Sequence, residues 1–179
     1  GDKLKVDSYT KSDMRLIHAL FGLLAMGNVA FGEIAQHHTV PSVPMKNTDG
    51  AVIGQVSLEV STNGAIFSGE FWGIPPGWHG IHLHENPDCS DPGKGFVKSG
   101  GHANPAKHQH GVRNDKGTHL GDLSNIYAFP ACLTSDDRTE TGQVVQARTQ
   151  QIMTVLSAAD APRSFAVILH ESADDYTTN

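Results

Sequence analysis

Histidine is concentrated in one part of this 179-residue chain: seven of its eleven histidines lie between His79 and His119. Residues 86–122, which hold most of them, are rich in Gly, Pro, Asp and Lys and show little hydrophobic periodicity. A loop of this length inside a compact domain is uncommon and usually functional. Neutral imidazole is the commonest metal ligand in proteins. The clustering therefore predicts a metal-binding loop carried by a folded scaffold.

The segments that flank this loop have the pattern of short β-strands. Apolar residues alternate with polar ones over residues 52–60 and again over 65–71, with a turn between them, which predicts a hairpin. Trp78–Glu85 and Ser164–His170 are further strand-like runs, whereas Val144–Leu156 fits either a strand with a short helix or a single helix. Several short strands with turn signals and one long loop indicate an all-β sandwich or barrel.

Composition and charge exclude several classes of protein. Apolar residues make up 38% of the chain and charged residues 18%, as in a soluble globular domain and unlike a disordered chain. Thirteen basic against nineteen acidic residues give a net charge of −6, without a run of basic residues, so a nucleic-acid partner is not expected. The two cysteines are too few for a disulfide-rich scaffold or a four-cysteine zinc module.

The N-terminal part predicts an export leader. Arg15 precedes an apolar stretch of about a dozen residues, and small residues follow at Ala30 and Gly32, as in a secretory signal peptide. The stretch is too short to span a bilayer comfortably, so no membrane span is expected after the leader is removed. We divide the chain into a leader region at 1–32 (signal peptide about 14–32), an N-terminal tail at 33–49 and a domain at 50–179. Export would place it in the periplasm or the extracellular space, where a disulfide persists.

The spacing of the histidines indicates how they could meet. His82 and His84 are separated by one residue on a predicted strand, so both imidazoles lie on one face. Three imidazoles with one carboxylate form the closed tetrahedral set of a structural zinc site, whereas imidazoles around an open position suit copper. His170 ends an apolar strand, where a histidine needs a partner to justify its burial. The long loop supplies the remaining candidates: His102, His110, His119 and Asp122.

Four sequence blocks, taken together and in this order, resemble the copper,zinc superoxide dismutase family, most closely its exported bacterial members. The resemblance covers roughly residues 50–176 and implies a Greek-key β-barrel or sandwich with long metal-binding loops. The blocks are Trp78–Cys89, Gly100–Gly111, His119–Leu123 and Val167–Tyr176.

Carried over residue by residue, the resemblance implies two adjacent metal sites that share the imidazolate of His102. It also implies that the Asp174 carboxylate orients His82 and His110, that His79 braces the backbone without binding metal, and that Cys89 is one half of a disulfide. The implied copper ligands are His82, His84, His102 and His170, and the implied zinc ligands are His102, His110, His119 and Asp122.

The chemistry implied by the resemblance is the conversion of superoxide anion to dioxygen and hydrogen peroxide. Copper would cycle between two oxidation states, zinc would keep the site ordered, and His102 would couple proton uptake to electron transfer. Lys94 and Lys98 precede the second block; they serve either solubility or the steering of the anionic substrate. A homodimer is one of the assemblies that the family allows.

The chain departs from the family at its C-terminal end. The family continues with a final strand that carries an arginine beside copper and the second cysteine of the disulfide, whereas this sequence stops at Asn179. We therefore expect a barrel without its last strand, and the alternative function is a non-enzymatic copper- and zinc-binding relative or a truncated pseudoenzyme. Cys132 is an alternative partner for Cys89.

Overall fold

The computed structural model describes six stretches of the chain, which hold all the candidate ligands. The predicted signal peptide at about 14–32 lies outside them. No helix in the described stretches is long and apolar enough to cross a membrane. The described residues are 3–6, 38–61, 64–111, 117–133, 137–153 and 164–177.

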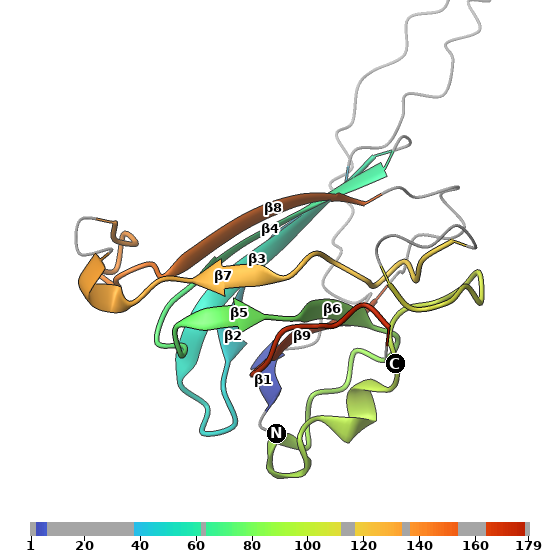
Figure 1. Ribbon diagram of the computed structural model, residues 1–179, viewed down its shortest axis with the longest axis horizontal. Helices are drawn as coiled ribbons and strands as arrows, with labels where there is room; N and C mark the ends of the chain where they lie inside the picture. Colours follow the sequence, from blue (N-terminus) through green and yellow to red (C-terminus); the bar gives the residue numbers. More distant parts are fainter. Residues whose placement is uncertain are drawn as a thin grey trace, which may run out of the picture.

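The regular secondary structure of the described residues consists almost entirely of β-strands, which form a seven-stranded sheet and a two-stranded one (Figure 1). The order in the large sheet is β6-β9-β1-β2-β3-β4-β8, and β5 pairs with β7 in the small sheet. The strands are β1 (Lys3–Val6), β2 (His38–Lys46), β3 (Val52–Ser61), β4 (Gly64–Phe71), β5 (Gly77–His79), β6 (Ile81–His84), β7 (Ile126–Ala128), β8 (Ala147–Met153) and β9 (Ala166–His170).

The predicted hairpin is confirmed as β3 and β4, which pair antiparallel from Gly54↔Phe71 to Ser61↔Gly64. Alternate residues of β4, among them Phe67 and Phe71, are buried, as the period of two requires. The ambiguous segment 144–156 contains strand β8, which pairs with β4 along its whole length. The described residues 144–153 therefore contain a strand at the edge of the large sheet and do not form a single helix.

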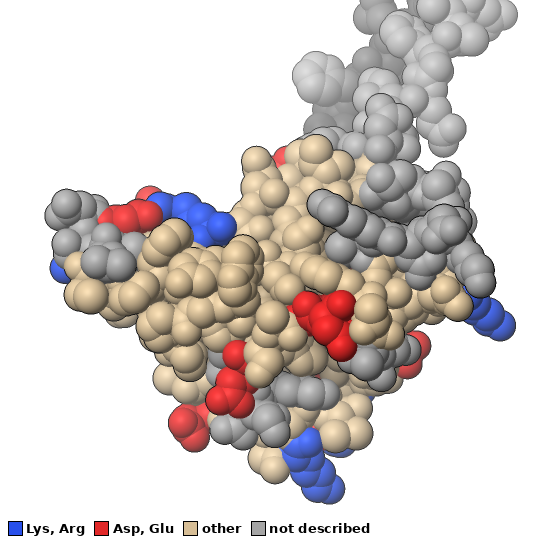
Figure 2. All heavy atoms as spheres, in the orientation of Figure 1, with Lys and Arg blue, Asp and Glu red and all other residues tan. Residues whose placement is uncertain are grey.

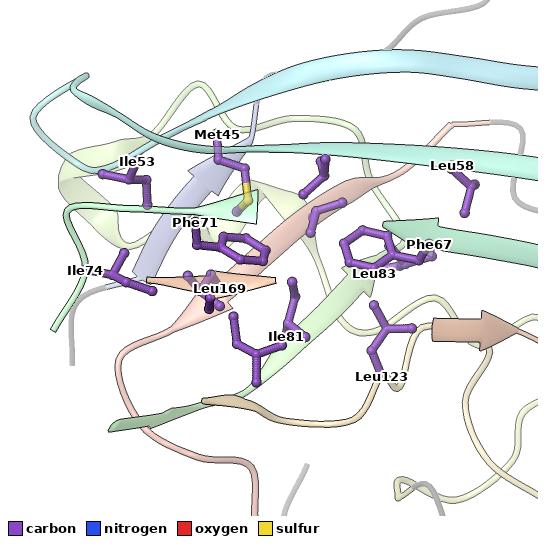
Figure 3. Packing of buried hydrophobic residues seen from close by; sticks show 14 of the residues in the cluster. Met45, Ile53, Leu58, Phe67, Phe71, Ile74, Ile81, Leu83, Leu123 and Leu169 are labelled. Carbon is purple, nitrogen blue, oxygen red and sulfur yellow. The ribbon is translucent and has the colours of Figure 1, made fainter. Parts of the chain in front are cut away.

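The sheet packs against itself around its larger hydrophobic core. Ile81 and Leu83 of β6 and Leu169 of β9 belong to the same buried cluster as Phe67 and Phe71 of β4, from the other end of the sheet. Figure 3 shows these side chains meeting between the strands. Burial of these apolar side chains from both ends is what holds the layers of the all-β fold together.

Three strands, β1, β2 and β7, lie in segments for which the sequence predicts no strand. Strand β2 lies within the expected N-terminal tail at 33–49, and its Met45 is fully buried in the core. Strand β1 lies within the leader region and pairs with both β9 (Lys3↔His170) and β2 (Lys5↔Lys46). Strand β1 therefore lies between β9 and β2 and joins them into one sheet.

The long loop between β6 and β7 lies against β6 through backbone hydrogen bonds. Ala103 N–H donates to the Leu83 carbonyl (2.8 Å), and Leu83 N–H donates to the Gly121 carbonyl (2.9 Å). A Cβ at residue 121 would collide with the Leu83 carbonyl oxygen, so only glycine permits this approach. The loop thus returns twice to the strand that carries His82 and His84.

Candidate metal centre

Strand β6 places two histidines in the interior. Ile81 and Leu83 point into the hydrophobic core, so His82 and His84 share the opposite face of the strand. Their exposed fractions are only 4% and 3%. Buried imidazoles need partners, and these two face further histidines from the long loop and from β9.

The first histidine cluster forms around this face of β6. Each of its four members offers one ring nitrogen, and these atoms all lie within 4.8 Å of one another. The rings of His82 and His102 stack with their centroids 4.0 Å apart, and β9, which pairs with β6, contributes the fourth histidine. The structure therefore brings together the four residues of the expected copper site: His82, His84, His102 and His170.

The second cluster lies beside the first and shares His102 with it. Its four ligand atoms also lie within 4.8 Å of one another, and they belong to His102, His110, His119 and Asp122. The Asp122 Oδ1 atom is at the centre of this group. It is 2.7 Å from His102 Nδ1, 3.0 Å from His110 Nδ1 and 3.3 Å from His119 Nδ1.

The donor atoms of both clusters fit metal ions. His82 uses Nε2 for a hydrogen bond, while its Nδ1 is buried without a hydrogen-bond partner among the described residues. His119 likewise has Nε2 3.0 Å from the His108 carbonyl oxygen, so Nδ1 is directed to Asp122. A buried ring nitrogen without a partner is costly, and a cation would remove that cost. Four imidazoles suit copper, and three imidazoles with a carboxylate suit zinc.

The electrostatics of the clusters favour the deprotonated, ligand-competent forms of His82 and Asp122. Burial, together with the charges of His102 and His170, lowers the pKa of His82 to about 4, so this imidazole is neutral at physiological pH. Burial alone would raise the pKa of Asp122, but a hydrogen bond from His102 and the Gly111 N–H outweigh it and hold that pKa well below its usual value. Metal ligands must be deprotonated, and both residues meet this condition.

The sequence comparison identifies the family to which such paired clusters belong. A sequence model of copper/zinc superoxide dismutases matches residues 52–179, which include every residue of both clusters. The chain belongs to the copper/zinc superoxide dismutase family.

Three relatives illustrate the similarity. A copper/zinc superoxide dismutase of Aquifex aeolicus is 28% identical over 171 residues, covering 92% of this chain and 90% of the relative. One from Neisseria meningitidis is 28% identical over 183 residues, covering 92% and 89%. Among solved structures, a superoxide dismutase-like protein from Bacillus subtilis superposes with a TM-score of 0.57 at 27% identity, covering 79% of this chain and 90% of that chain. The similarity thus extends over most of the length of each protein.

In this member of the superoxide dismutase family, Asp174 connects the two clusters. Its Oδ2 is 2.7 Å from His82 Nε2, and its Oδ1 is 3.0 Å from His110 Nε2. Burial would raise the pKa of Asp174, but the hydrogen bonds from His110, the Tyr176 N–H and His82 outweigh it, so the pKa is lowered. Burial lowers the pKa of His110, but the carboxylates of Asp174 and Asp122 outweigh burial and raise it. The carboxylate therefore orients one histidine of each cluster.

His79 lies outside both clusters. Its Nδ1 is 2.8 Å from the His170 carbonyl oxygen and its Nε2 is 2.8 Å from the Pro75 carbonyl oxygen, so both ring nitrogens face the backbone. His108, which the sequence gives no ligand role, offers its carbonyl to His119, and its own Nδ1 faces the Thr118 carbonyl oxygen at 3.1 Å.

The remaining predicted site residues lie around the loop that precedes His102. Lys94 ends a 3₁₀ turn, η2 (Pro92–Lys94), and Lys98 lies in a second, η3 (Val97–Ser99); both lysines are exposed. Cys89 is buried against Phe96, whereas Cys132 is exposed. No disulfide joins the two cysteines, so the alternative pairing of Cys132 with Cys89 is not present in the structure.

Sequence reasoning missed several residues that hold the ligands in place. Ser99 is buried, and its Oγ lies 3.2 Å from His84 Nδ1, which also faces the Gly100 carbonyl oxygen at 2.8 Å. Asn104 holds the His108 backbone through two hydrogen bonds, and Asn125 holds the backbone of Asp174. Their only signal in the sequence is proximity: each lies within three residues of a predicted ligand.

Proposed function

We propose that this protein disproportionates superoxide, with copper held by the first cluster and zinc held by the second. The observation that carries the proposal is that His102 belongs to both clusters, so that one imidazole connects two different donor sets. When bound, copper supplies a one-electron redox couple, so that two superoxide anions and two protons yield one dioxygen and one hydrogen peroxide. Zinc supplies a fixed positive charge at the second cluster.

We assign the proton-handling role to His102. Its Nδ1 is directed to Asp122, so the other ring nitrogen is available to the first cluster. That nitrogen would lose its proton when both clusters are filled, and it would hold a proton when its bond on the copper side is released. A proton held there lies within the cluster in which peroxide is formed. Asp174 would keep the ring of His82 in place, and His79 would keep the backbone of His170 in place.

Lys94 and Lys98 would guide the anionic substrate. Each copy of the chain is negative overall, so superoxide needs local positive potential to reach the site efficiently. Both lysines lie on the loop that leads to His102. Replacing both with glutamine should lower the rate of superoxide removal most at low ionic strength, because salt screens the attraction of exposed charges.

We also propose that the protein is exported to the periplasm or the extracellular space. The leader-like sequence at about 14–32 supports this proposal.

We further propose that the protein forms a homodimer. A cluster of exposed aromatic rings supports the dimer: Trp78, Tyr127 and Phe129 are 58%, 39% and 50% exposed. The Trp78–Tyr127 and Tyr127–Phe129 ring centroids are 5.1 and 5.0 Å apart.

The partner that fits this aromatic cluster is a second copy of the chain. Figure 2 shows uncharged surface over β5 and β7, so two copies, each with a net charge of −6, could meet there without like charges facing one another. Trp and Tyr are the residues that most often dominate binding energy at interfaces.

The proposed activity is tested by loading the full chain with copper and zinc and measuring superoxide removal and its sensitivity to cyanide. We expect one copper and one zinc per chain and removal far faster than by a copper chelate at equal concentration. A fully loaded protein that is no faster than the chelate would contradict the enzyme and favour a metal-binding relative without turnover. Loading that fails to reach one copper would contradict the assignment of the first cluster.

A further inference from the structure

The Asp174 carboxylate directs Oδ2 to His82 and Oδ1 to His110. These two histidines belong to different clusters. Asp174 lies four residues beyond the end of β9, in a segment without regular secondary structure. A carboxylate on such a segment needs other contacts to fix its direction. The structure places those contacts on Asn125 and Tyr176.

The Asn125 side chain makes hydrogen bonds to both the N–H and the carbonyl group of Asp174. Asp174 N–H donates to Asn125 Oδ1, and Asn125 Nδ2 donates to the Asp174 carbonyl, each at 2.9 Å. This paired arrangement fixes the peptide groups on both sides of the Asp174 Cα. Because Asn125 follows Asp122 by three residues, the same short segment supports the second cluster and the carboxylate that connects it to the first.

Tyr176 completes the arrangement from the other end. Its hydroxyl oxygen accepts a hydrogen bond of 2.7 Å from Asn125 N–H, and its own N–H donates to Asp174 Oδ1 at 2.7 Å. Tyr176 has a φ of +58°, a left-handed conformation that is uncommon for a residue other than glycine. Such strain persists only where the surrounding contacts hold it, and it is often found at functional sites.

We propose that Asn125 and Tyr176 are positioning residues that fix the Asp174 carboxylate and thereby orient His82 and His110 together. We refer to Asn125, Asp174 and Tyr176 as the Asn125 latch. The proposal rests on the proposed function for its metals, but the latch itself is a set of hydrogen bonds in the protein. It acts through the ring orientation of two histidines, so its loss affects both clusters at once.

The test compares Asn125→Ala and Tyr176→Phe with the wild type and with Asn47→Ala. The Asn47 Oδ1 atom accepts backbone hydrogen bonds in the turn after β2, so its variant loses an asparagine side chain of the same kind outside the latch. The first measurement is made on the metal-free protein by ¹⁵N NMR of the imidazoles. We expect the Nε2–H tautomer of His82 and its slow proton exchange in the wild type and in Asn47→Ala, and their loss in Asn125→Ala. Retention of both signals in Asn125→Ala would overturn the proposal, whatever metals the protein binds.

The second measurement is metal affinity by competition with chelators, together with the visible spectra of Cu²⁺ and of Co²⁺ in the zinc site. Loss of an outer partner of a metal ligand, such as Asp174, weakens binding by about 10- to 100-fold. Because Asn125 acts through Asp174, we expect a loss of at most this size for both metals in Asn125→Ala, with a smaller loss in Tyr176→Phe. A purely structural role would lower thermal stability and leave the spectra of the loaded protein unchanged; that result would also overturn the latch. Lack of turnover in a wild type with normal spectra would contradict the proposed superoxide dismutase activity but not the proposed positioning role of the latch.

Discussion

His82 and Asp174, which are 92 residues apart in the chain, share a hydrogen bond of 2.7 Å between Nε2 and Oδ2. The bond directs the opposite nitrogen of His82, Nδ1, into the first cluster, where it is buried. A strand and a distant C-terminal segment thus determine together which nitrogen is offered to a metal.

Substitution of a ligand in one cluster should affect mainly the metal held by that cluster. His84→Ala removes a nitrogen of the first cluster, so we expect copper binding and turnover to be abolished while zinc is retained. His119→Ala removes a nitrogen of the second cluster, so we expect this variant to lose mainly zinc binding and thermal stability. Each loss should exceed the roughly 10- to 100-fold effect of removing an outer partner. Metal content by mass spectrometry and superoxide assays measure both; equal loss of both metals in each variant would contradict the division of ligands.

Gly121 should be intolerant of any side chain. A Cβ at this position would meet the Leu83 carbonyl oxygen and would lie 2.9 Å from the Ala103 backbone nitrogen. Gly121→Ala therefore forces the Asp122 turn away from β6, and overpacking of this kind costs about 1–3 kcal/mol. We expect a lower free energy of unfolding in urea and weaker zinc binding. Gly93→Ala is the control, because nothing lies within 4 Å of its added Cβ; similar losses in both variants would refute the steric explanation.

The sequence predicted best where the signal is local. Alternation in residues 65–71 identified β4, and the His82–His84 spacing identified two imidazoles on one face, because both depend only on the pleat of one strand. Strand β2 was not predicted because Pro41 and Pro44 interrupt its pattern, and prolines are normally confined to strand edges and bulges. The register shift between Val40 and Val43 in its pairing with β3 accommodates Pro41, whereas Pro44 pairs in register with Gln55.

The contacts that could not be predicted join segments distant in sequence. Strand β1 has only four residues, and its assignment depends on pairing with β9 at the other end of the chain. Asn125 and Tyr176 were missed for the same reason: their role appears only when residues about 50 positions apart meet. The ligands themselves could be predicted because each of them lies at a defined position in a family motif. Which backbone atoms hold those ligands depends on the fold.

The pair formed by Glu70 and Arg148 should make the stability of the metal-free protein depend on pH. Hydrogen bonds from Arg148 (2.8 Å) and from Gln55 (2.8 Å) lower the pKa of Glu70 below its usual value. The unfolded chain therefore takes up this proton first, so the stabilisation is complete above the usual carboxyl pKa and is lost as the pH falls through the lowered one. We expect Glu70→Gln to cost less than about 1 kcal/mol at neutral pH, because both side chains are partly exposed. Urea unfolding should show this difference shrinking in acid; a difference independent of pH, or one matched by Glu140→Gln at an exposed turn, would contradict it.

The proposed dimer makes a prediction that separates the aromatic cluster from ordinary exposed apolar residues. Trp78→Lys places a charge within the aromatic cluster, so two copies would bring like charges together where the wild type has uncharged rings. Loss of a tryptophan that dominates an interface costs about 2 kcal/mol or more, at least roughly a 25-fold weaker dimer. Sedimentation velocity over a wide range of protein concentration measures the change. Ile152→Lys is the matched control, because Ile152 is 83% exposed on β8 and lies outside the aromatic cluster. A wild type that stays monomeric at every concentration, or a dimer weakened equally by both substitutions, would show that this surface does not hold two copies together.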